Sequence, residues 1–167
     1  MRLPPLRRDA DAAIDVPFKM LISLVVMAMA VVALLPALQA YQSGEVEHRT
    51  EVAVAGIAAA ARSVFHHPGS SRTVVLDITP AGSVRIVSMS IGGDLTGPPG
   101  EACVISWRLS DGTRGNHAIT TNGGQVPLAG PDGQAITIEG HRAILALETR
   151  EAPPGAWYDH YVEVRAI

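Results

Sequence analysis

The chain has 167 residues, a formal net charge of −3 and a single cysteine, which together limit its size and its chemistry. The length is that of one domain. One cysteine excludes an intramolecular disulfide and a zinc site built on cysteines alone. A nucleic-acid interface needs clustered basic residues. The sequence has no such cluster, so nucleic acid is excluded as a partner.

The first element is a run of 19 residues without a charged side chain, Met20–Leu38. A helix that is apolar all round needs lipid or a large protein interior, and about 100 further residues are too few to form that interior. The run is also longer than the roughly 7–15 apolar residues of a signal peptide. We therefore favour a transmembrane helix over residues 16–40. A signal peptide cleaved after Leu38-Gln39-Ala40 is the alternative.

The length and the flanking charges of this segment fit a span with its N-terminus inside. Nineteen helical residues rise about 28 Å, close to the roughly 30 Å hydrocarbon thickness of a bilayer. Four basic residues precede the span, namely Arg2, Arg7, Arg8 and Lys19. Only Arg49 follows it closely. The positive-inside rule then places residues 1–15 in the cytoplasm and the C-terminal domain outside the cell membrane. Pro17 suits the first turn of a helix that begins near Val16.

A second, amphipathic helix is expected over residues 41–67 as a continuation of the span. Its apolar positions recur at helical spacing and are Val54, Ile57, Ala61 and Val64. The segment His66-His67-Pro68-Gly69 ends it, because proline cannot continue a helix and glycine permits the turn. Gly44 is a point at which the rod could break. If it does not break, one helix runs from about Val16 to Phe65.

The remainder, residues 70–167, alternates between apolar and polar residues as short strands do. Pro80-Ala81-Gly82 is expected to form a hairpin-like turn, with the return strand starting near Val84. Ser110-Asp111-Gly112 is expected to form another turn, and a last strand should run from Trp157 to Val164. The predicted fold class is therefore α+β: a long N-terminal helix followed by a small antiparallel β-sandwich or barrel-like domain.

The residue patterns predict no catalytic or metal site. The six histidines match no metal-ligand spacing, and GxSxG, HExxH and phosphate-loop motifs are missing. We therefore expect no enzyme activity and no cofactor. Cys103 is expected to be a buried small hydrophobe. The aromatic group Trp157, Tyr158 and Tyr161 is expected to belong to a core strand with its hydroxyls at the rim, rather than to a contact surface.

A long helix with an apolar first half, an amphipathic second half and a following β domain is the plan of type IV pilins. The start of the chain resembles archaeal type IV pilin-like, prepilin-type membrane-anchored surface proteins. The matching residues are Arg7-Arg8-Asp9-Ala10, then Asp11-Ala12-Ala13-Ile14-Asp15, then the apolar run. The resemblance implies that a prepilin peptidase removes the leader. A cut after Ala10 makes Asp11 the first mature residue and Asp15 the fifth. Many pilins carry a glutamate at that position, which pairs with the N-terminal amine of a neighbouring subunit, whereas this chain has an aspartate there.

The resemblance predicts a structural subunit or minor component of a surface filament. Its partners would be the lipid bilayer, and identical or related subunits through the N-terminal helix. The alternative is a plain single-pass anchor that holds a β domain for binding an envelope or surface partner. Ala10, Asp11 and Asp15 are the residues on which processing and assembly would depend.

Overall fold

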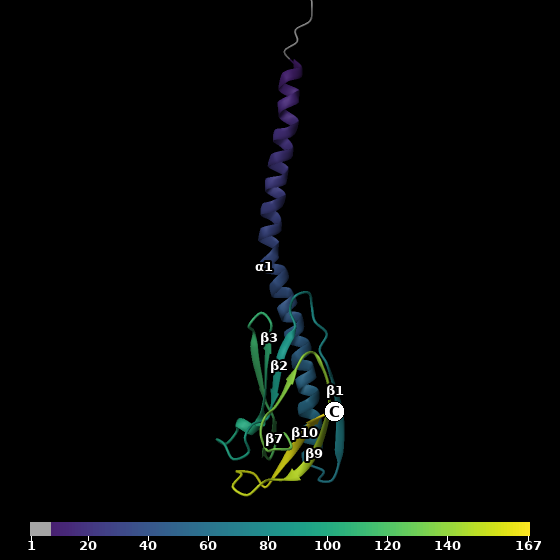
Figure 1. The fold of residues 1–167 in the computed structure, drawn as a ribbon, viewed down its shortest axis with the longest axis vertical. Coiled ribbons are helices and arrows are strands. Elements are labelled where there is room, and N and C mark those ends of the chain that lie inside the picture. The colour runs from purple at the N-terminus through teal and green to yellow at the C-terminus, as the bar shows by residue number, and fades with distance from the viewer. Residues whose placement is uncertain (1–7) are drawn as a thin grey trace, which may run out of the picture. The chain divides into compact units, whose positions relative to one another are not determined.

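The computed structural model describes residues 8–167, with side chains from Pro17 onward, and begins with a 58-residue helix, α1 (Arg8–Phe65) (Figure 1). Both Pro17 and Pro36 lie inside α1. The prediction of a helix start near Val16 was therefore wrong. The segment before Pro17 contains three alanines, which favour helix, so the helix extends through the proline. Of the predicted leader, residues 1–7 lie outside the described residues.

The chain divides into two compact units between Tyr41 and Gln42. In the first unit every described side chain, from Pro17 to Tyr41, is exposed. The second unit joins the last part of α1 to all the strands. The amphipathic half of the helix thus belongs to the same compact unit as the β domain, and it ends at Phe65, as the sequence indicates.

The strands form two four-stranded sheets and one small ribbon (Figure 1). The first sheet has the order β1-β9-β10-β7 and consists of β1 (Ser71–Asp77), β9 (Arg142–Glu151), β10 (His160–Ala166) and β7 (Leu128–Ala129). The second has the order β4-β3-β2-β8 and consists of β4 (Arg114–Ala118), β3 (Val104–Leu109), β2 (Ile86–Ile91) and β8 (Ile136–Glu139). The ribbon pairs β5 (Thr120–Thr121) with β6 (Gly124–Gln125), and a 3-10 turn, η1 (Glu101–Cys103), precedes β3. Neighbouring strands are antiparallel except for β10 and β7, which are parallel.

Two sequence expectations about the strands were wrong. The Pro80-Ala81-Gly82 turn does not join a hairpin, because β1 pairs with β9 whereas β2 pairs with β3 and β8. Only a single bridge between Ala81 and Val84 forms there. The segment carries the chain from one sheet to the other. Pro80 and Gly82 are exposed there, whereas the flanking Ile78 and Val84 are buried. The last strand begins at His160 rather than at Trp157.

One hydrophobic core joins the second half of α1 to both sheets. The predicted stripe of Val54, Ile57, Ala61 and Val64 is fully buried, which confirms the amphipathic interpretation. The Thr149 hydroxyl of β9 donates a hydrogen bond of 2.9 Å to the Val64 carbonyl and fixes the end of the helix on the first sheet. The architecture is thus an α+β fold with one long helix and a small domain of antiparallel and mixed sheets.

Candidate functional site

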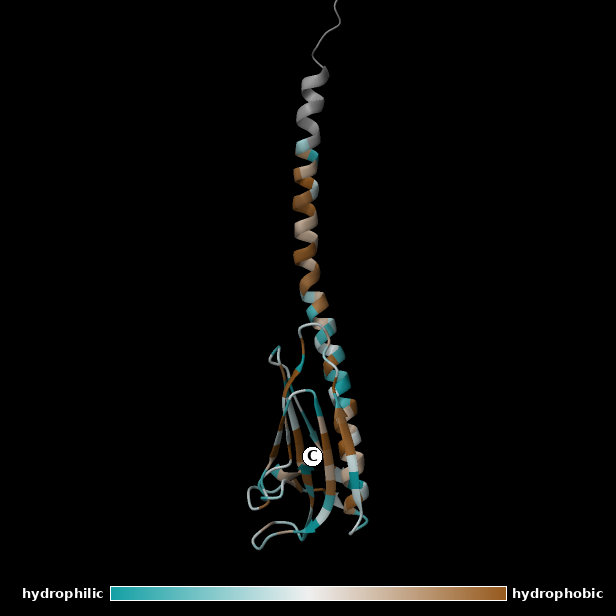
Figure 2. Ribbon diagram, turned by 45° about the vertical axis from the view of Figure 1, so that its right-hand side comes forward, coloured by the Kyte–Doolittle hydropathy of each residue, from teal (hydrophilic) through white to brown (hydrophobic). Residues whose placement is uncertain are grey.

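The first candidate is the exposed apolar half of α1 (Figure 2). Among the residues that the structure describes, one helix is long and apolar enough to cross a membrane, and its apolar window is entirely unburied. Fourteen large apolar side chains between Phe18 and Leu38 are at least 44% exposed. Burying one such side chain gains about 1.5–3 kcal/mol. The segment therefore has a strong tendency to enter lipid or to pack against other apolar helices.

The predicted processing and assembly residues precede this segment. Ala10, Asp11 and Asp15 lie within the helical backbone of α1, but their side chains lie outside the described part of the chain. Their roles remain predictions from the resemblance.

Two loops of the β domain bind α1 just before Gly44 and explain why the helix continues through that glycine. The Ser43 hydroxyl donates a 2.5 Å hydrogen bond to Asp111 in the β3–β4 turn. The Gln42 amide oxygen accepts a 3.4 Å hydrogen bond from the Ser83 backbone. Hydrogen bonds from Ser43 and from the Thr113 backbone lower the pKa of the Asp111 carboxyl below its ordinary value.

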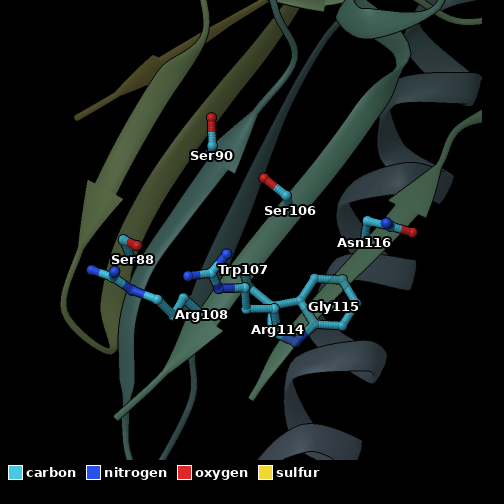
Figure 3. Close-up of a pocket in the computed structure, with 8 residues that line it drawn as sticks. All are labelled: Ser88, Ser90, Ser106, Trp107, Arg108, Arg114, Gly115 and Asn116. Atoms are coloured by element: carbon cyan, nitrogen blue, oxygen red, sulfur yellow. The ribbon is translucent and has the colours of Figure 1, made fainter. Parts of the chain in front are cut away.

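The second candidate is a polar hollow of about 590 Å³ on the face of the second sheet that points away from the core (Figure 3). Two cross-strand rows of side chains form it. The first row pairs Asn116 with Ser106 and Ser106 with Ser90. The second pairs Arg114 with Arg108 and Arg108 with Ser88. We call this set of six residues the arginine hollow.

The two arginines of the hollow carry like charges on directly paired residues. Side chains opposite each other on antiparallel strands have Cβ atoms about 4.5–5.5 Å apart, and like charges there are destabilising. Both side chains are exposed, and neither forms an ion pair with any described residue. Glu139 of β8 lies opposite Ser88 on the side away from Arg108 and makes no ion pair with either arginine.

A buried tryptophan supports the hollow from the core side. Trp107 lies between the outward residues of β3, is 6% exposed and covers Gly115 of β4. A Cβ on Gly115 would lie 2.1 Å from Cζ2 of the indole, so only glycine fits without a shift. This contact lies where β3 pairs with β4, one residue from the two arginines on the opposite face of the sheet.

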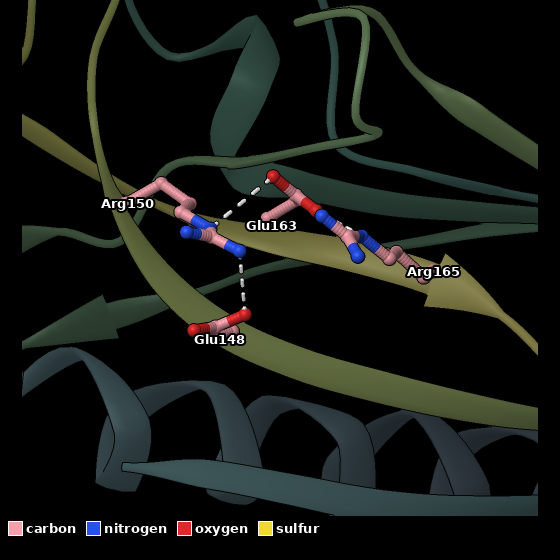
Figure 4. Close-up of polar contacts among 4 residues, drawn as sticks. All are labelled: Glu148, Arg150, Glu163 and Arg165. Atoms are coloured by element: carbon pink, nitrogen blue, oxygen red, sulfur yellow. Dashed lines mark hydrogen bonds and ion pairs between the residues drawn. The ribbon is translucent and has the colours of Figure 1, made fainter. Parts of the chain in front are cut away.

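A third cluster, around Glu163 of β10, is structural (Figure 4). The Glu163 side chain is only 7% exposed, and a buried charge is costly unless it is paired. It forms ion pairs with Arg165 and, at 3.6 Å, with Arg150, whose other contact is Glu148 at 2.9 Å. Burial, with Glu163 adding a smaller effect, raises the pKa of Tyr161. The carboxylate is fully engaged in joining β9 to β10.

The expectation that Trp157, Tyr158 and Tyr161 belong to one core strand holds only for Tyr161, because the last strand begins at His160. Tyr161 is buried, as expected for a core strand, whereas Trp157 is 66% exposed. The Tyr158 hydroxyl accepts a 2.8 Å hydrogen bond from the Gly100 backbone and lies 3.4 Å from the Cys103 sulfur. Cys103 is buried, which confirms that prediction, and burial raises the pKa of its thiol. Burial and the raised pKa both disfavour the reactive thiolate.

The described residues contain no group of three or more histidine, cysteine, aspartate or glutamate side chains arranged to hold a metal. The His67 Nδ1–H donates a 2.9 Å hydrogen bond to the Ser63 carbonyl, close to the end of α1.

The sequence did not predict the arginine hollow, because its residues come from three strands whose pairing the alternation pattern does not specify.

No family model matches the chain, and neither the curated proteins nor the solved structures yield a significant match to it.

Proposed function

We propose that this chain is a type IV pilin-like structural subunit or minor component of a cell-surface filament. The observation that supports it is the continuity of α1, whose first half is apolar and unburied and whose second half enters the core of a small β domain. In the membrane the first half contacts lipid. In a filament the same surface packs against the first halves of neighbouring subunits, while the β domains lie outside.

Asp15 is the residue that separates this proposal from a plain anchor. A carboxylate at mid-membrane costs about 2.5–3.5 kcal/mol on insertion scales, and less near the interface. In a lone anchor Asp15 remains in the headgroup region or caps the helix. In a filament, pairing with the free amine of a neighbouring subunit that begins at Asp11 would offset the cost of removing the carboxylate from water.

The test is assembly of Asp15→Ala in cells, with Asp9→Ala as the matched control because Asp9 is removed with the leader. We expect Asp15→Ala to leave membrane insertion and leader removal intact, to reduce the sheared filament fraction, and to be largely rescued by Asp15→Glu. Sequencing of the mature N-terminus reports the processing step separately. A start at Asp11 supports prepilin processing, Met1 indicates a plain anchor, and Tyr41 indicates a cleaved signal peptide. Wild-type protein that mild detergent always extracts as a monomer, with no filament fraction, would refute assembly.

The orientation of the domain has its own test. A cysteine added after Ile167 should react with a membrane-impermeant maleimide on whole cells, because the basic excess before the span predicts an outside C-terminus. The buried Cys103 does not compete for the label. Labelling that requires lysis would overturn the orientation.

A second candidate function is a membrane-anchored β domain that binds an envelope or surface partner. The arginine hollow favours it, because two guanidinium groups that form no ion pair with any described residue lie on paired strands and offer a surface suited to an anion.

A further inference from the structure

We propose that the arginine hollow binds an acidic polysaccharide, with the carboxylate of one sugar unit held between Arg108 and Arg114. Directly opposed arginines destabilise a strand pair, and the described part of the chain offers them no carboxylate as an ion-pair partner. The carboxylate in the adjoining turn, Asp111, already accepts hydrogen bonds from Ser43 and Thr113. An external anion would relieve this repulsion.

The side chains around the arginines favour a sugar over other sources of a carboxylate. A guanidinium group presents a planar fork of donors that matches a carboxylate. The rest of the hollow consists of the hydroxyls of Ser88, Ser90 and Ser106 and the amide of Asn116, which both donate and accept hydrogen bonds as sugar hydroxyls require. The only large apolar side chain among the residues that line the hollow is Trp107, which is only 6% exposed. An acyl chain or an apolar peptide side chain would find no matching surface.

The charge of the hollow changes from one edge of the second sheet to the other. The polar rows continue onto β8 with Thr137 beside Ser90 and Glu139 beside Ser88. Four strands at about 4.8 Å spacing span roughly 14 Å, which suits an extended polymer. Positive charge lies at the β3–β4 end and the negative charge of Glu139 at the β8 end. The acidic unit is therefore placed over the arginines, and units without a charge are favoured over β8.

This inference relies on the proposed function only for access to an extracellular polymer, because that access requires the domain to lie outside the cell. Binding in solution requires neither filaments nor leader removal. A failure of binding would leave the filament proposal intact, and a failure of assembly would leave the binding site intact.

The test is binding of polygalacturonate oligomers to the full chain in zwitterionic nanodiscs, measured by calorimetry. The matched ligand is the same oligomer with its carboxyl groups reduced to alcohols. We expect the acidic oligomer to bind and the reduced one to bind at least about tenfold more weakly, because charge-assisted hydrogen bonds are lost. Equal binding of the two oligomers, or no binding of the acidic one, would overturn the proposal.

The variant is Arg108→Gln with Arg114→Gln, and its control is Arg72→Gln with Arg142→Gln on exposed positions of the first sheet. Both pairs remove two positive charges. We expect the first to weaken binding by at least about tenfold and the control to retain it. Because the first pair relieves repulsion, it should stay folded, which the unfolding temperature checks. An equal loss of oligomer binding in both double variants would show non-specific electrostatic attraction and refute the binding site. Arginine-dependent binding to phosphatidylglycerol vesicles with none to the oligomer would assign the hollow to lipid and refute the polysaccharide.

Discussion

Substitution of Ile57 by alanine tests whether the second half of α1 is an integral part of the β domain. Ile57 is fully buried in the cluster that contains residues of α1 and of both sheets. Ile→Ala in such a core costs about 2–5 kcal/mol, because transfer free energy is lost and a cavity remains. For a domain of this size one kcal/mol lowers the unfolding temperature by roughly 4 °C. We therefore expect a decrease of roughly 8–20 °C.

The matched control is Val52→Ala, which removes an aliphatic side chain of the same helix that is 60% exposed. We expect it to change stability by about 0.5 kcal/mol or less. Unfolding is followed in detergent micelles by tryptophan fluorescence, to which the buried Trp107 and the exposed Trp157 contribute. The first half of α1 contains no tryptophan, so the micelle-bound segment adds nothing to the signal. If Ile57→Ala and Val52→Ala behave alike, the helix is only loosely attached and the shared core is refuted.

Three further predictions concern the β domain. Cys103 should resist alkylation at neutral pH and react fully once urea unfolds the chain, because burial raises its pKa; rapid labelling of the native protein would contradict this. Gly115→Ala should lower stability by about 1–3 kcal/mol and shift the Trp107 emission, because the new Cβ would lie 2.1 Å from the indole; an unchanged spectrum would show that the contact is loose. The folded pKa of Asp111 is lowered from 3.8, so its contribution to stability is present above that value and is lost as the pH falls through the folded pKa. The urea midpoint of Asp111→Asn should therefore fall less on acidification than that of the wild type, and parallel curves would contradict the assignment.

The helix could be predicted from the sequence because its signals are local. A run without charges indicates the span, and spacing of three and four residues indicates the face that Val54, Ile57 and Val64 bury. The effect of Gly44 could not be predicted, because the contacts that hold the helix there come from Gln42 and Ser43 to distant loops. The start at Arg8 was not predicted because Pro17 suits the first turn of a helix, whereas the alanines before it favour helix in their own right.

The order of the strands within the two sheets could not be predicted from the sequence, for a different reason. Alternation separates the two faces of a strand, and Ile105, Trp107 and Leu109, which alternate with polar residues along β3, are all buried. It does not identify the partner strand. The pairing of β1 with β9 joins residues about 70 positions apart, from Ser71 with Glu148 to Asp77 with Arg142. Nothing in the spacing of either strand specifies the other, so the local turn at Pro80-Ala81-Gly82 was wrongly interpreted as a hairpin.

The arginine hollow lies between these two cases, because part of it was accessible from the sequence. The predicted turn at Ser110-Asp111-Gly112 is centred on Asp111, and residues equidistant from that centre pair in the structure, including Arg108 with Arg114. A symmetric hairpin would therefore have revealed two arginines opposite each other. Their cross-strand repulsion has no compensating ion pair among the described residues, which distinguishes them from Arg150 and Arg165 around Glu163. Like charges on directly paired residues are destabilising. Under our proposal an acidic ligand offsets this repulsion and also contacts the serines of β2 that line the hollow.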